Sequence, residues 1–350
     1  MQPARPMTHE PSDRATGGGS GGADPQRTLG VLLMTFGSPA TLEDVPAYLS
    51  SVRGGRPVAD DLVAEFQRRY RVIGGSPLLS ITQAQAAAVE RVLNEGAGDT
   101  RFKVGIGMRH APPFIADGLA ELAAAGARRI VAIIMSPQYS PLIMGGYHRA
   151  VEAASDRLGA GVQVSVAGAW HRHPGFLRAL ARRVTEALDR FPAGERDRVP
   201  VILTAHSLPK AVVDREPEYL EQLKETVQAV VALAGLDATS ADGQRRWWFA
   251  YQSAGHTPEE WLKPDLKDVL PLLRAAGYRR VLVVPVQFLA DHLEILYDID
   301  VAARAEAEAA GTEFHRIESL NLLPTFIQAL ADVARAELQI EAPMAEAHAG

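Results

Sequence analysis

A continuous apolar run that stops abruptly at a histidine constrains the fold of this chain most. Residues 201–209 read Val-Ile-Leu-Thr-Ala-His-Ser-Leu-Pro, so the run ends at His206 and turns at Pro209. Apolar runs bounded by turn residues are typical of strands in parallel sheets covered on both faces. In open α/β sheets, ligands bind beyond the carboxyl ends of the strands, and imidazole exchanges protons near neutral pH. His206 is therefore a candidate catalytic residue, with a hydrogen-bonded structural histidine as the alternative.

Apolar runs alternate with longer amphipathic segments along most of the chain. We predict strands at residues 28–35, 102–108, 129–135, 163–167, 199–204, 246–251 and 280–286. We predict helices at residues 42–52, 59–70, 83–94, 112–125, 146–158, 174–190, 217–234, 265–276, 289–310 and 323–338. This βαβα rhythm predicts an α/β fold with parallel sheets flanked by helices.

The second half of the chain repeats patterns of the first. Residues 126–138 resemble residues 277–287, and residues 32–39 resemble residues 202–209. We therefore predict two similar, Rossmann-like halves with a ligand cleft between them; chance similarity of βα units is the alternative. The predicted division is a disordered tail at 1–27, a first half at 28–168, a second half at 169–340 whose last helix is free to pack back on the first, and a disordered tail at 341–350.

Composition and charge exclude several classes of protein. The 350 residues carry a formal net charge of −6, which argues against a nucleic-acid-binding protein with a basic stripe. The chain has no cysteine, which excludes disulfides and cysteine-ligated iron–sulfur clusters. No stretch approaches the ~18–20 apolar residues that span a bilayer, and the start of the chain lacks the apolar segment of a secretory signal. We expect a cytoplasmic protein, with a monomer preferred.

A second strand is followed by a dense group of carboxylates. Residues 284–300 read Val-Pro-Val-Gln-Phe-Leu-Ala-Asp-His-Leu-Glu-Ile-Leu-Tyr-Asp-Ile-Asp. If a helix begins near residue 289, Glu294 and Asp298 share one face, where like charges repel by a few tenths of a kcal/mol. Such a face needs a bound cation, a proton shared between the groups, or solvent. These alternatives stay open on the residues alone.

Other motifs carry weaker signals. His171 and His173 are two residues apart, which is not the helical spacing of a zinc site, so we expect surface or capping roles. Tyr139 follows a strand and could contact a ligand or simply pack. Arg53 and Arg56 could bind a ligand carboxylate or be solvated. The chain has neither a dinucleotide-binding glycine fingerprint nor a phosphate-binding loop.

Together these segments resemble the ferrochelatases, which insert ferrous iron into a porphyrin. The likeness runs from about Gly30 to Leu338. It is carried by Thr-Ala-His-Ser-Leu-Pro at 204–209, Tyr-Gln-Ser at 251–253, Thr-Pro-x-x-Trp-Leu at 257–262, Pro-Val-x-Phe-x-x-Asp-His-Leu-Glu-x-Leu-Tyr-Asp at 285–298, Ile-Gly-Gly-Ser-Pro at 73–77 and Pro-Gln-Tyr-Ser at 137–140. The family fold, two Rossmann-like (chelatase-type) halves around a porphyrin cleft, agrees with the internal repeat.

The resemblance implies roles for particular residues. His206 and Glu294 are expected to be the catalytic and metal-binding pair, with Asp298 as a relay, because two pyrrole protons must leave before the metal is seated. The expected substrate-binding residues are Met34, Phe36, Arg53, Ser76, Tyr139 and Trp261, with Leu78 and Ile143 as further wall residues. Fe²⁺ and porphyrin are expected as substrates, with no permanently bound cofactor and no iron–sulfur cluster. Transient partners would be an upstream porphyrin oxidase and a haem acceptor, without nucleic acid.

The chain also departs from its relatives. Phe36 stands where some Gram-positive relatives carry a tyrosine able to ligate the product iron, and Ala302 and Gly54 replace an acidic residue and an arginine. The choice between protoporphyrin IX and coproporphyrin III is therefore left open. The alternative functions are a cobalt or nickel chelatase of a related tetrapyrrole pathway and a non-catalytic, two-lobed haem-binding protein.

Overall fold

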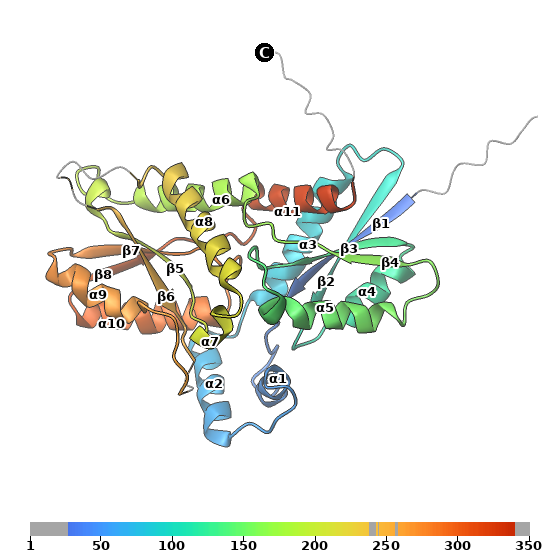
Figure 1. Cartoon of the computed structure of the whole chain (residues 1–350), viewed down its shortest axis with the longest axis horizontal. Helices are drawn as coiled ribbons and strands as arrows, with labels where there is room; N and C mark the ends of the chain where they lie inside the picture. The colour runs from blue at the N-terminus through green and yellow to red at the C-terminus, as the bar shows by residue number, and fades with distance from the viewer. Residues whose placement is uncertain (1–26, 238–242, 244, 256–257, 340–350) are drawn as a thin grey trace, which may run out of the picture.

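The described part of the chain folds into two four-stranded parallel sheets with helices on both faces (Figure 1). The computed structural model describes residues 27–237, 243, 245–255 and 258–339. The strands are β1 (Arg27–Thr35), β2 (Thr100–Met108), β3 (Arg129–Ile134), β4 (Gln163–Val166), β5 (Val201–His206), β6 (Trp247–Gln252), β7 (Arg280–Pro285) and β8 (Glu313–Arg316). The helices are α1 (Val45–Val52), α2 (Asp60–Val72), α3 (Leu78–Asn94), α4 (Ile115–Ala124), α5 (Pro141–Ser155), α6 (Pro174–Leu188), α7 (Lys210–Val213), α8 (Pro217–Leu233), α9 (Leu266–Ala275), α10 (Arg304–Ala309) and α11 (Pro324–Glu337), with a 3₁₀ turn η1 (Arg196–Arg198) and a π-helix η2 (Glu294–Ala303). The predicted tails lie outside the described residues, except that Arg27 already belongs to β1.

The two sheets have the same strand order and the same register. Their orders are β2-β1-β3-β4 and β6-β5-β7-β8. Leu32 of β1 pairs with Ala132 of β3, and Ile202 of β5 pairs with Val283 of β7. These are the residues that the sequence repeat aligns, so the repeat is structural. The predicted α/β fold of two Rossmann-like halves is confirmed.

Alternate residues of each central strand enter different apolar layers. In β1, Leu29, Val31 and Leu33 belong to a cluster with α3, whereas Leu32 and Met34 pack with α4 and α5. In β5, Val201, Leu203 and Ala205 pack with α6 and α8, and Ile202 packs with α9, η2 and α10. Both faces of both sheets are thus covered, which explains the uninterrupted apolar runs of the strands.

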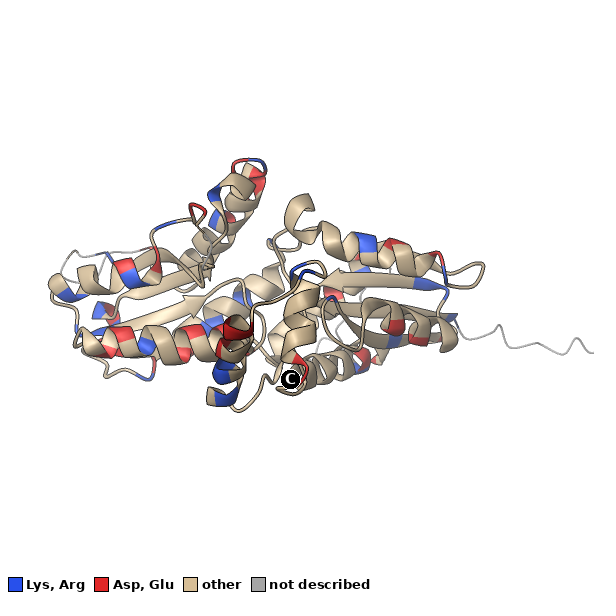
Figure 2. Cartoon of the chain, turned by 90° about the horizontal axis from the view of Figure 1, so that it is seen from below, with Lys and Arg blue, Asp and Glu red and all other residues tan. Residues whose placement is uncertain are grey.

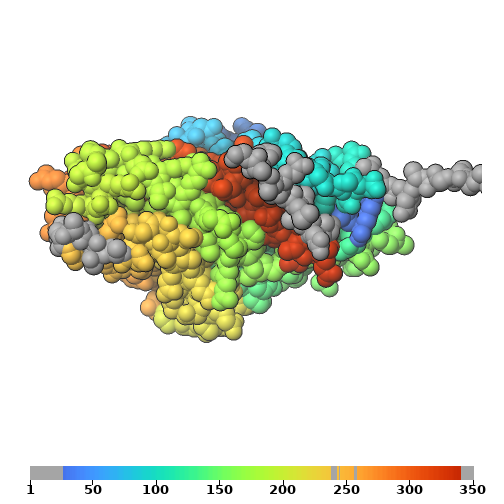
Figure 3. Space-filling model, turned by 90° about the horizontal axis from the view of Figure 1, so that it is seen from above, coloured from blue at the N-terminus to red at the C-terminus, as the bar shows by residue number. Residues whose placement is uncertain are grey.

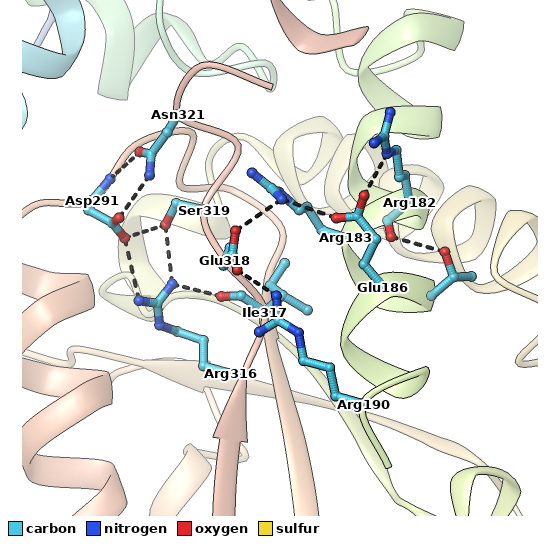
Figure 4. A network of polar contacts seen from close by, with 11 residues as sticks. Arg182, Arg183, Glu186, Arg190, Asp291, Arg316, Ile317, Glu318, Ser319 and Asn321 are labelled. Carbon is cyan, nitrogen blue, oxygen red and sulfur yellow. Dashed lines mark hydrogen bonds and ion pairs between the residues drawn. The ribbon is translucent and has the colours of Figure 1, made fainter. Parts of the chain in front are cut away.

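The last helix of the chain, α11, packs against the first half, whereas α6 packs within the second half. Helix α6, which follows β4, contacts α8 and β7, whereas α11, which follows β8, contacts α3 and β3. Figure 3 shows α11, in red, between the green surface of α6 and the cyan surface of the first half. Ion pairs join Arg183 and Arg190, in and just after α6, to Glu318 after β8, the first at 3.1 Å (Figure 4). One apolar cluster therefore runs through both halves.

Charged residues of both signs are interspersed on the outer helices of both halves (Figure 2). This distribution agrees with the modest net charge of −6 and gives no broad basic surface in that view. Among the described residues, no helix is both long enough and apolar enough to cross a membrane.

Four predicted helix starts are wrong by three to five residues, beginning with α1, which starts at Val45 rather than at residue 42. Helix α5 begins at Pro141 rather than at residue 146, because Ser140 accepts the N–H of Ile143 at 3.2 Å and caps the helix. Helix α4 begins at Ile115 rather than at residue 112, where Asp117 accepts the N–H of Phe114 at 2.8 Å. Helix α3 begins five residues earlier than predicted, at Leu78.

Two elements of the second half differ more. Strand β8 was not predicted, because its four residues include Glu313, His315 and Arg316 and show no apolar run. The available signal was the internal repeat, since β8 lies 150 residues after β4. The helix predicted to begin at residue 289 is a loop up to His292, followed by the π-helix η2. Single π-helical turns are rare and concentrate at functional sites.

Helix α4 packs so closely on the first sheet that a glycine is required. A Cβ on Gly118 would lie 2.2 Å from the carbonyl oxygen of Ile106 and 2.6 Å from Leu32 Cδ1. We predict that Gly118→Ala lowers the free energy of unfolding by about 3 kcal/mol, measured by urea denaturation. Gly159→Ala, where a Cβ would meet nothing within 4 Å, should change it by less than about 0.5 kcal/mol; equal effects of the two changes would contradict this packing.

Candidate active site

The imidazole of His206 is oriented by its own neighbourhood at the carboxyl end of β5. The ring Nδ1 contacts the carbonyl oxygen of Ser207. Because a carbonyl only accepts, Nδ1 carries the hydrogen, and Nε2 of the neutral ring is left with a free lone pair. This Nε2 lies 3.5 Å from Oε2 of Glu294, the first residue of η2.

A second imidazole points at the same carboxylate oxygen. Nδ1 of His292 lies 2.9 Å from the carbonyl oxygen of Ala290, so by the same argument its Nε2 is also an acceptor. This Nε2 is 4.0 Å from Glu294 Oε2. That oxygen is buried and has no hydrogen-bond partner among the described residues, although the Glu294 side chain is 37% exposed. Three acceptors thus converge without a hydrogen between them.

The spacing of the pair fits a shared cation. A separation of 3.5 Å is longer than a normal N–H···O hydrogen bond. Two ligand atoms bound to one ion at 2.0–2.2 Å with tetrahedral geometry lie about 3.4 Å apart. The described residues contain no group of three or more His, Asp or Glu side chains already spaced as a metal site. An ion held by His206 and Glu294 would therefore keep positions for other ligands.

Asp298 lies four residues after Glu294 in η2, and its surroundings raise the pKa of its carboxyl group. Burial raises its pKa, and the neighbouring Glu294 raises it further, whereas Ser253, Arg69 and His206 act in the opposite direction. Arg69 Nη1 lies 3.6 Å from Asp298 Oδ1. Glu294 and Asp298 both lie in η2, and their like charges raise the pKa of Asp298 in addition to burial.

Helix α2 of the first half anchors η2 of the second. The guanidinium groups of Arg68 and Arg69 lie 5.3 and 5.1 Å from the ring centre of Tyr297, and Arg68 also donates to its hydroxyl. Leu293 packs with Tyr70 in a small apolar cluster between the same elements. The segment that carries Glu294 is therefore positioned from both halves.

A polar network fixes the loop that precedes Glu294 (Figure 4). Asp291 accepts hydrogen bonds from Ser319 Oγ at 2.6 Å and from Asn321 Nδ2 at 2.8 Å. Arg316 lies 3.4 Å from Asp291 and makes a bidentate ion pair with Asp300 at 2.8 Å. Asp291 thus ties the turn before His292 to the end of the second sheet.

Tyrosines of the first half lie close enough to Glu294 that burial and, with it, the charge of Glu294 raise the pKa of Tyr48 and Tyr70. Burial raises the pKa of the Tyr48 hydroxyl, with smaller contributions from Tyr70, Glu294 and Tyr147. Tyr147 in turn lies 5.7 Å from the guanidinium of Arg109. The carboxyl edges of both sheets therefore contribute to one region.

Phe36 occupies the position in the first half that His206 occupies in the second. It follows β1 directly and is 42% exposed, so it is available to a ligand. The imidazole of His110 lies against it, with ring centres 4.5 Å apart, and its Nδ1 is 3.0 Å from Ser51 Oγ. Burial, with help from Arg109, lowers the pKa of His110 to about 4. His110 is thus neutral near pH 7.

This lowered pKa makes stability depend on pH. Between pH 6.5 and about 4 the histidine binds a proton in the unfolded chain but not in the folded one, so stability falls as the pH falls. We predict that His110→Gln reduces the loss of unfolding free energy between pH 7.5 and 5 by about 1 kcal/mol, after allowance for partial exposure to solvent. Urea denaturation at the two pH values measures this, and an unchanged loss would contradict the lowered pKa.

The predicted substrate-binding residues differ in how far their side chains are exposed. Met34 is wrong as a wall residue, since it lies inside β1, where its side chain is 0% exposed and packs in the core with α4 and α5. Leu78 is also buried, at the start of α3, and Ile143 is partly buried. Arg53 is exposed at the end of α1, and the Ser76 hydroxyl accepts the N–H of Leu78 at 3.4 Å.

Tyr139 and Trp261 are held by the second half. The Tyr139 backbone exchanges two hydrogen bonds with the Gln222 side chain of α8, at 2.8 and 3.1 Å. Trp261 pairs with Pro209, three residues after His206, and its ring lies against Gly255. Both are partly exposed, so their predicted contact with a ligand stays a prediction.

A cavity of about 550 Å³ lies away from this region, at the amino ends of the second sheet. It is lined by charged side chains, including Arg246 and Arg280, which pair with Asp197 at 3.0 Å and Glu313 at 2.7 Å. Ligands of parallel α/β sheets bind at the opposite, carboxyl edge. This cavity is therefore at the edge of the sheet opposite His206 and Glu294.

Comparison with known proteins agrees with this geometry. The sequence profile named Ferrochelatase matches residues 28–338, nearly the whole described chain. The chain belongs to the ferrochelatase family. A ferrochelatase of Deinococcus radiodurans is 39% identical over 310 residues, which are 88% of this chain and 95% of that protein. Coproporphyrin III ferrochelatases of Geobacillus thermodenitrificans and Bacillus subtilis are 35% and 34% identical, over 90% and 89% of this chain and 98% and 99% of their own.

Among solved structures, SirB from Bacillus subtilis with Fe³⁺ is similar at a TM-score of 0.52 and 10% identity, over 90% of this chain and 99% of that chain. At this identity the likeness shows the fold alone. It agrees with the two-lobed α/β architecture of this ferrochelatase, and the predicted family is confirmed.

Sequence reasoning on this ferrochelatase missed two imidazoles near the site. His292 stood in the acidic segment, and its place before Glu294 was the available signal. His110 follows the end of β2, and polar residues at a strand end were the signal there. The distant pair behaves differently: His173 caps α6 by accepting the N–H of Gly175 at 3.2 Å, as predicted, whereas His171 is buried and lies 2.8 Å from Glu225.

Proposed function

We propose that this protein inserts Fe²⁺ into a porphyrin and releases two protons, with His206 and Glu294 as the catalytic pair. The observation that carries the proposal is the contact between His206 Nε2 and Glu294 Oε2, two acceptors 3.5 Å apart with no hydrogen available between them. Such a pair has a place for one positive charge, either a proton or a divalent ion.

The chemistry of metal insertion uses both kinds of charge. A free porphyrin carries two pyrrole N–H groups, and both hydrogens must leave as protons when four nitrogens bind Fe²⁺. A neutral His206 accepts one proton at Nε2, and Glu294 accepts or passes on the other. The negative charge of Glu294 also attracts the incoming cation. Asp298, whose pKa burial raises, extends this route by one helical turn as a relay.

The substrate inference is coproporphyrin III rather than protoporphyrin IX. Most of the relatives with 32–35% identity are named for coproporphyrin III. This substrate has four propionates, which suit arginines at the rim of the site, and Arg53 and Arg56 are exposed at the end of α1. Phe36, Tyr139 and Trp261 are the proposed aromatic contacts of the macrocycle, with Ser76 nearby on the first half.

We further propose that the protein has no resident cofactor. The reaction needs no resident cofactor, because the metal itself is a substrate and no electron is transferred. We propose a cytoplasmic monomer that receives porphyrin from an oxidase and passes its product to a haem acceptor. A cobalt or nickel chelatase is the alternative enzyme, and a non-catalytic haem carrier is the alternative binder.

Anaerobic insertion assays test the proposal. Purified protein is given Fe²⁺, Co²⁺ or Ni²⁺ with coproporphyrin III or protoporphyrin IX, and the loss of porphyrin fluorescence is followed. We expect the highest kcat/KM with Fe²⁺ and coproporphyrin III. A preference for protoporphyrin IX would overturn the substrate inference, a preference for Co²⁺ or Ni²⁺ would favour the alternative chelatase, and binding without insertion would favour the haem carrier.

A further inference from the structure

A buried side-chain amide lies directly beneath His206. Gln287 follows β7 at the carboxyl edge of the second sheet and is 9% exposed. Its Oε1 accepts the backbone N–H of His206 at 3.1 Å. Its Nε2 donates to the hydroxyl oxygen of Tyr219 on α8, which is itself buried. The glutamine thus connects a helix on one face of the sheet to the backbone of the catalytic histidine.

The end of the strand ladder explains why this contact is needed. Strands β5 and β7 pair as far as Thr204 and Pro285, and the N–H of Val286 donates to the Thr204 carbonyl at 2.9 Å. The N–H of His206 lies beyond this last pair. A buried N–H without a partner destabilises a fold by about 1–3 kcal/mol. The side chain of Gln287 supplies the acceptor in place of a strand.

Glutamine is suited to this position because its amide both accepts and donates. Its oxygen serves His206, while its nitrogen needs an acceptor, which Tyr219 provides. Burial raises the pKa of the Tyr219 hydroxyl, so the phenol stays neutral over the working range of pH. The bridge therefore carries no charge of its own.

Three contacts then fix the imidazole of His206. Gln287 holds its N–H, the carbonyl oxygen of Gln252 holds the N–H of Ser207 at 2.7 Å, and the Ser207 carbonyl holds the ring Nδ1. With all three in place, Nε2 is directed at Glu294. The second and third contacts use backbone carbonyl groups, which a substitution does not remove. The first uses the side chain of Gln287, so a substitution at Gln287 removes it without changing His206.

We propose that Gln287, held by Tyr219, is a positioning residue that aims His206 at Glu294. The inference rests on the proposed function of that pair. Gln287 reaches neither metal nor porphyrin in this arrangement; it acts through the backbone of His206. It is thus expected to affect the proton and metal steps more than porphyrin binding.

The first test separates kcat from KM. Gln287→Met keeps the size of the side chain but removes both hydrogen bonds, and we expect kcat to fall about tenfold with the porphyrin KM within about twofold. Gln138→Met is the matched control, since Gln138 is a buried glutamine after β3 whose amide donates to Thr226 at 2.9 Å. Tyr219→Phe should have a smaller effect, and the double variant Tyr219→Phe/Gln287→Met should be no slower than Gln287→Met.

The second test reads the titration of His206 without activity. Gln287→Glu places a carboxylate beneath the imidazole, where hydrogen bonds from His206 and Tyr219 favour its charged form. We expect ¹⁵N NMR to show the pKa of His206 raised by about one unit, and the acid limb of kcat/KM to move upward with it. Gln138→Glu should leave the His206 titration in place.

The outcomes separate the positioning role of Gln287 from the proposed function of His206 and Glu294. An unmoved His206 titration in Gln287→Glu, or equal losses of kcat in Gln287→Met and Gln138→Met, would overturn the positioning role. If the wild-type protein failed to insert metal, the proposed function would fall, while the NMR titration would still show whether Gln287 controls His206. A raised pKa of His206 in Gln287→Glu, together with non-additive effects of Tyr219→Phe and Gln287→Met on kcat, would support the inference.

Discussion

His206→Ala is expected to lower the rate of Fe²⁺ insertion by about 10³-fold while porphyrin affinity changes little. The imidazole supplies the acceptor lone pair at Nε2, and alanine supplies none. General acid–base groups contribute about 10²–10⁴-fold to a rate, and a lost metal ligand adds to that effect. Stopped-flow insertion measures the rate, and quenching of intrinsic fluorescence measures porphyrin affinity.

The control for this change is His315→Ala. His315 lies outside the site, where its ring packs on Phe191 and pairs with Glu313 at 2.8 Å. Insertion by this variant should stay within about twofold of wild type. If His206→Ala kept wild-type insertion, His206 would be a structural histidine, the alternative that the sequence left open.

Glu294→Gln is expected to slow insertion by about 10²-fold without destabilising the fold. The amide has nearly the same shape as the carboxylate, but it accepts no proton and attracts no cation. Because Oε2 is buried without a hydrogen-bond partner in the described structure, the charge has no stabilising contact there to lose. The KM for Fe²⁺ should rise more than the KM for porphyrin, since the metal meets this side chain directly.

Glu121→Gln on the exposed face of α4 makes the same change in net charge away from the site. It should leave both KM values within about twofold, which separates the local charge of Glu294 from the overall field of the protein. A variant of Glu294 that inserted iron at the wild-type rate would rule out the carboxylate as proton acceptor.

The sequence predicted those parts of the fold that depend on long apolar runs. The strand that ends at His206, the repeat of Leu32–Ala132 pairing in Ile202–Val283, and the helices between them all follow from periodicity and from burial on both faces. The same apolar runs could not show which residues near a strand end are exposed to a ligand. Met34 was expected in the ligand cleft because it lies near the end of β1, but it is still inside the strand and packs with α4 and α5, whereas Phe36 lies beyond the strand end and is exposed.

The site itself depended more on tertiary contacts. Glu294 and Asp298 were predicted on one helical face, but the π-helix that carries them is held by Arg68 and Arg69 of α2 and by Arg316 of β8, which pairs with Asp300. No local pattern in residues 294–303 specifies such a helix. The packing of α11 against α3 and β3 of the first half likewise depends on contacts that appear only once both sheets exist.

The most direct test of the central claim is the position of a metal ion in the protein. Crystals soaked with Zn²⁺ as a stand-in for Fe²⁺, and measured at the zinc absorption edge, would reveal it by anomalous scattering. The account predicts one strong peak about 2.0–2.2 Å from both His206 Nε2 and Glu294 Oε2. A peak bound by neither side chain, with these two atoms still facing each other, would contradict it.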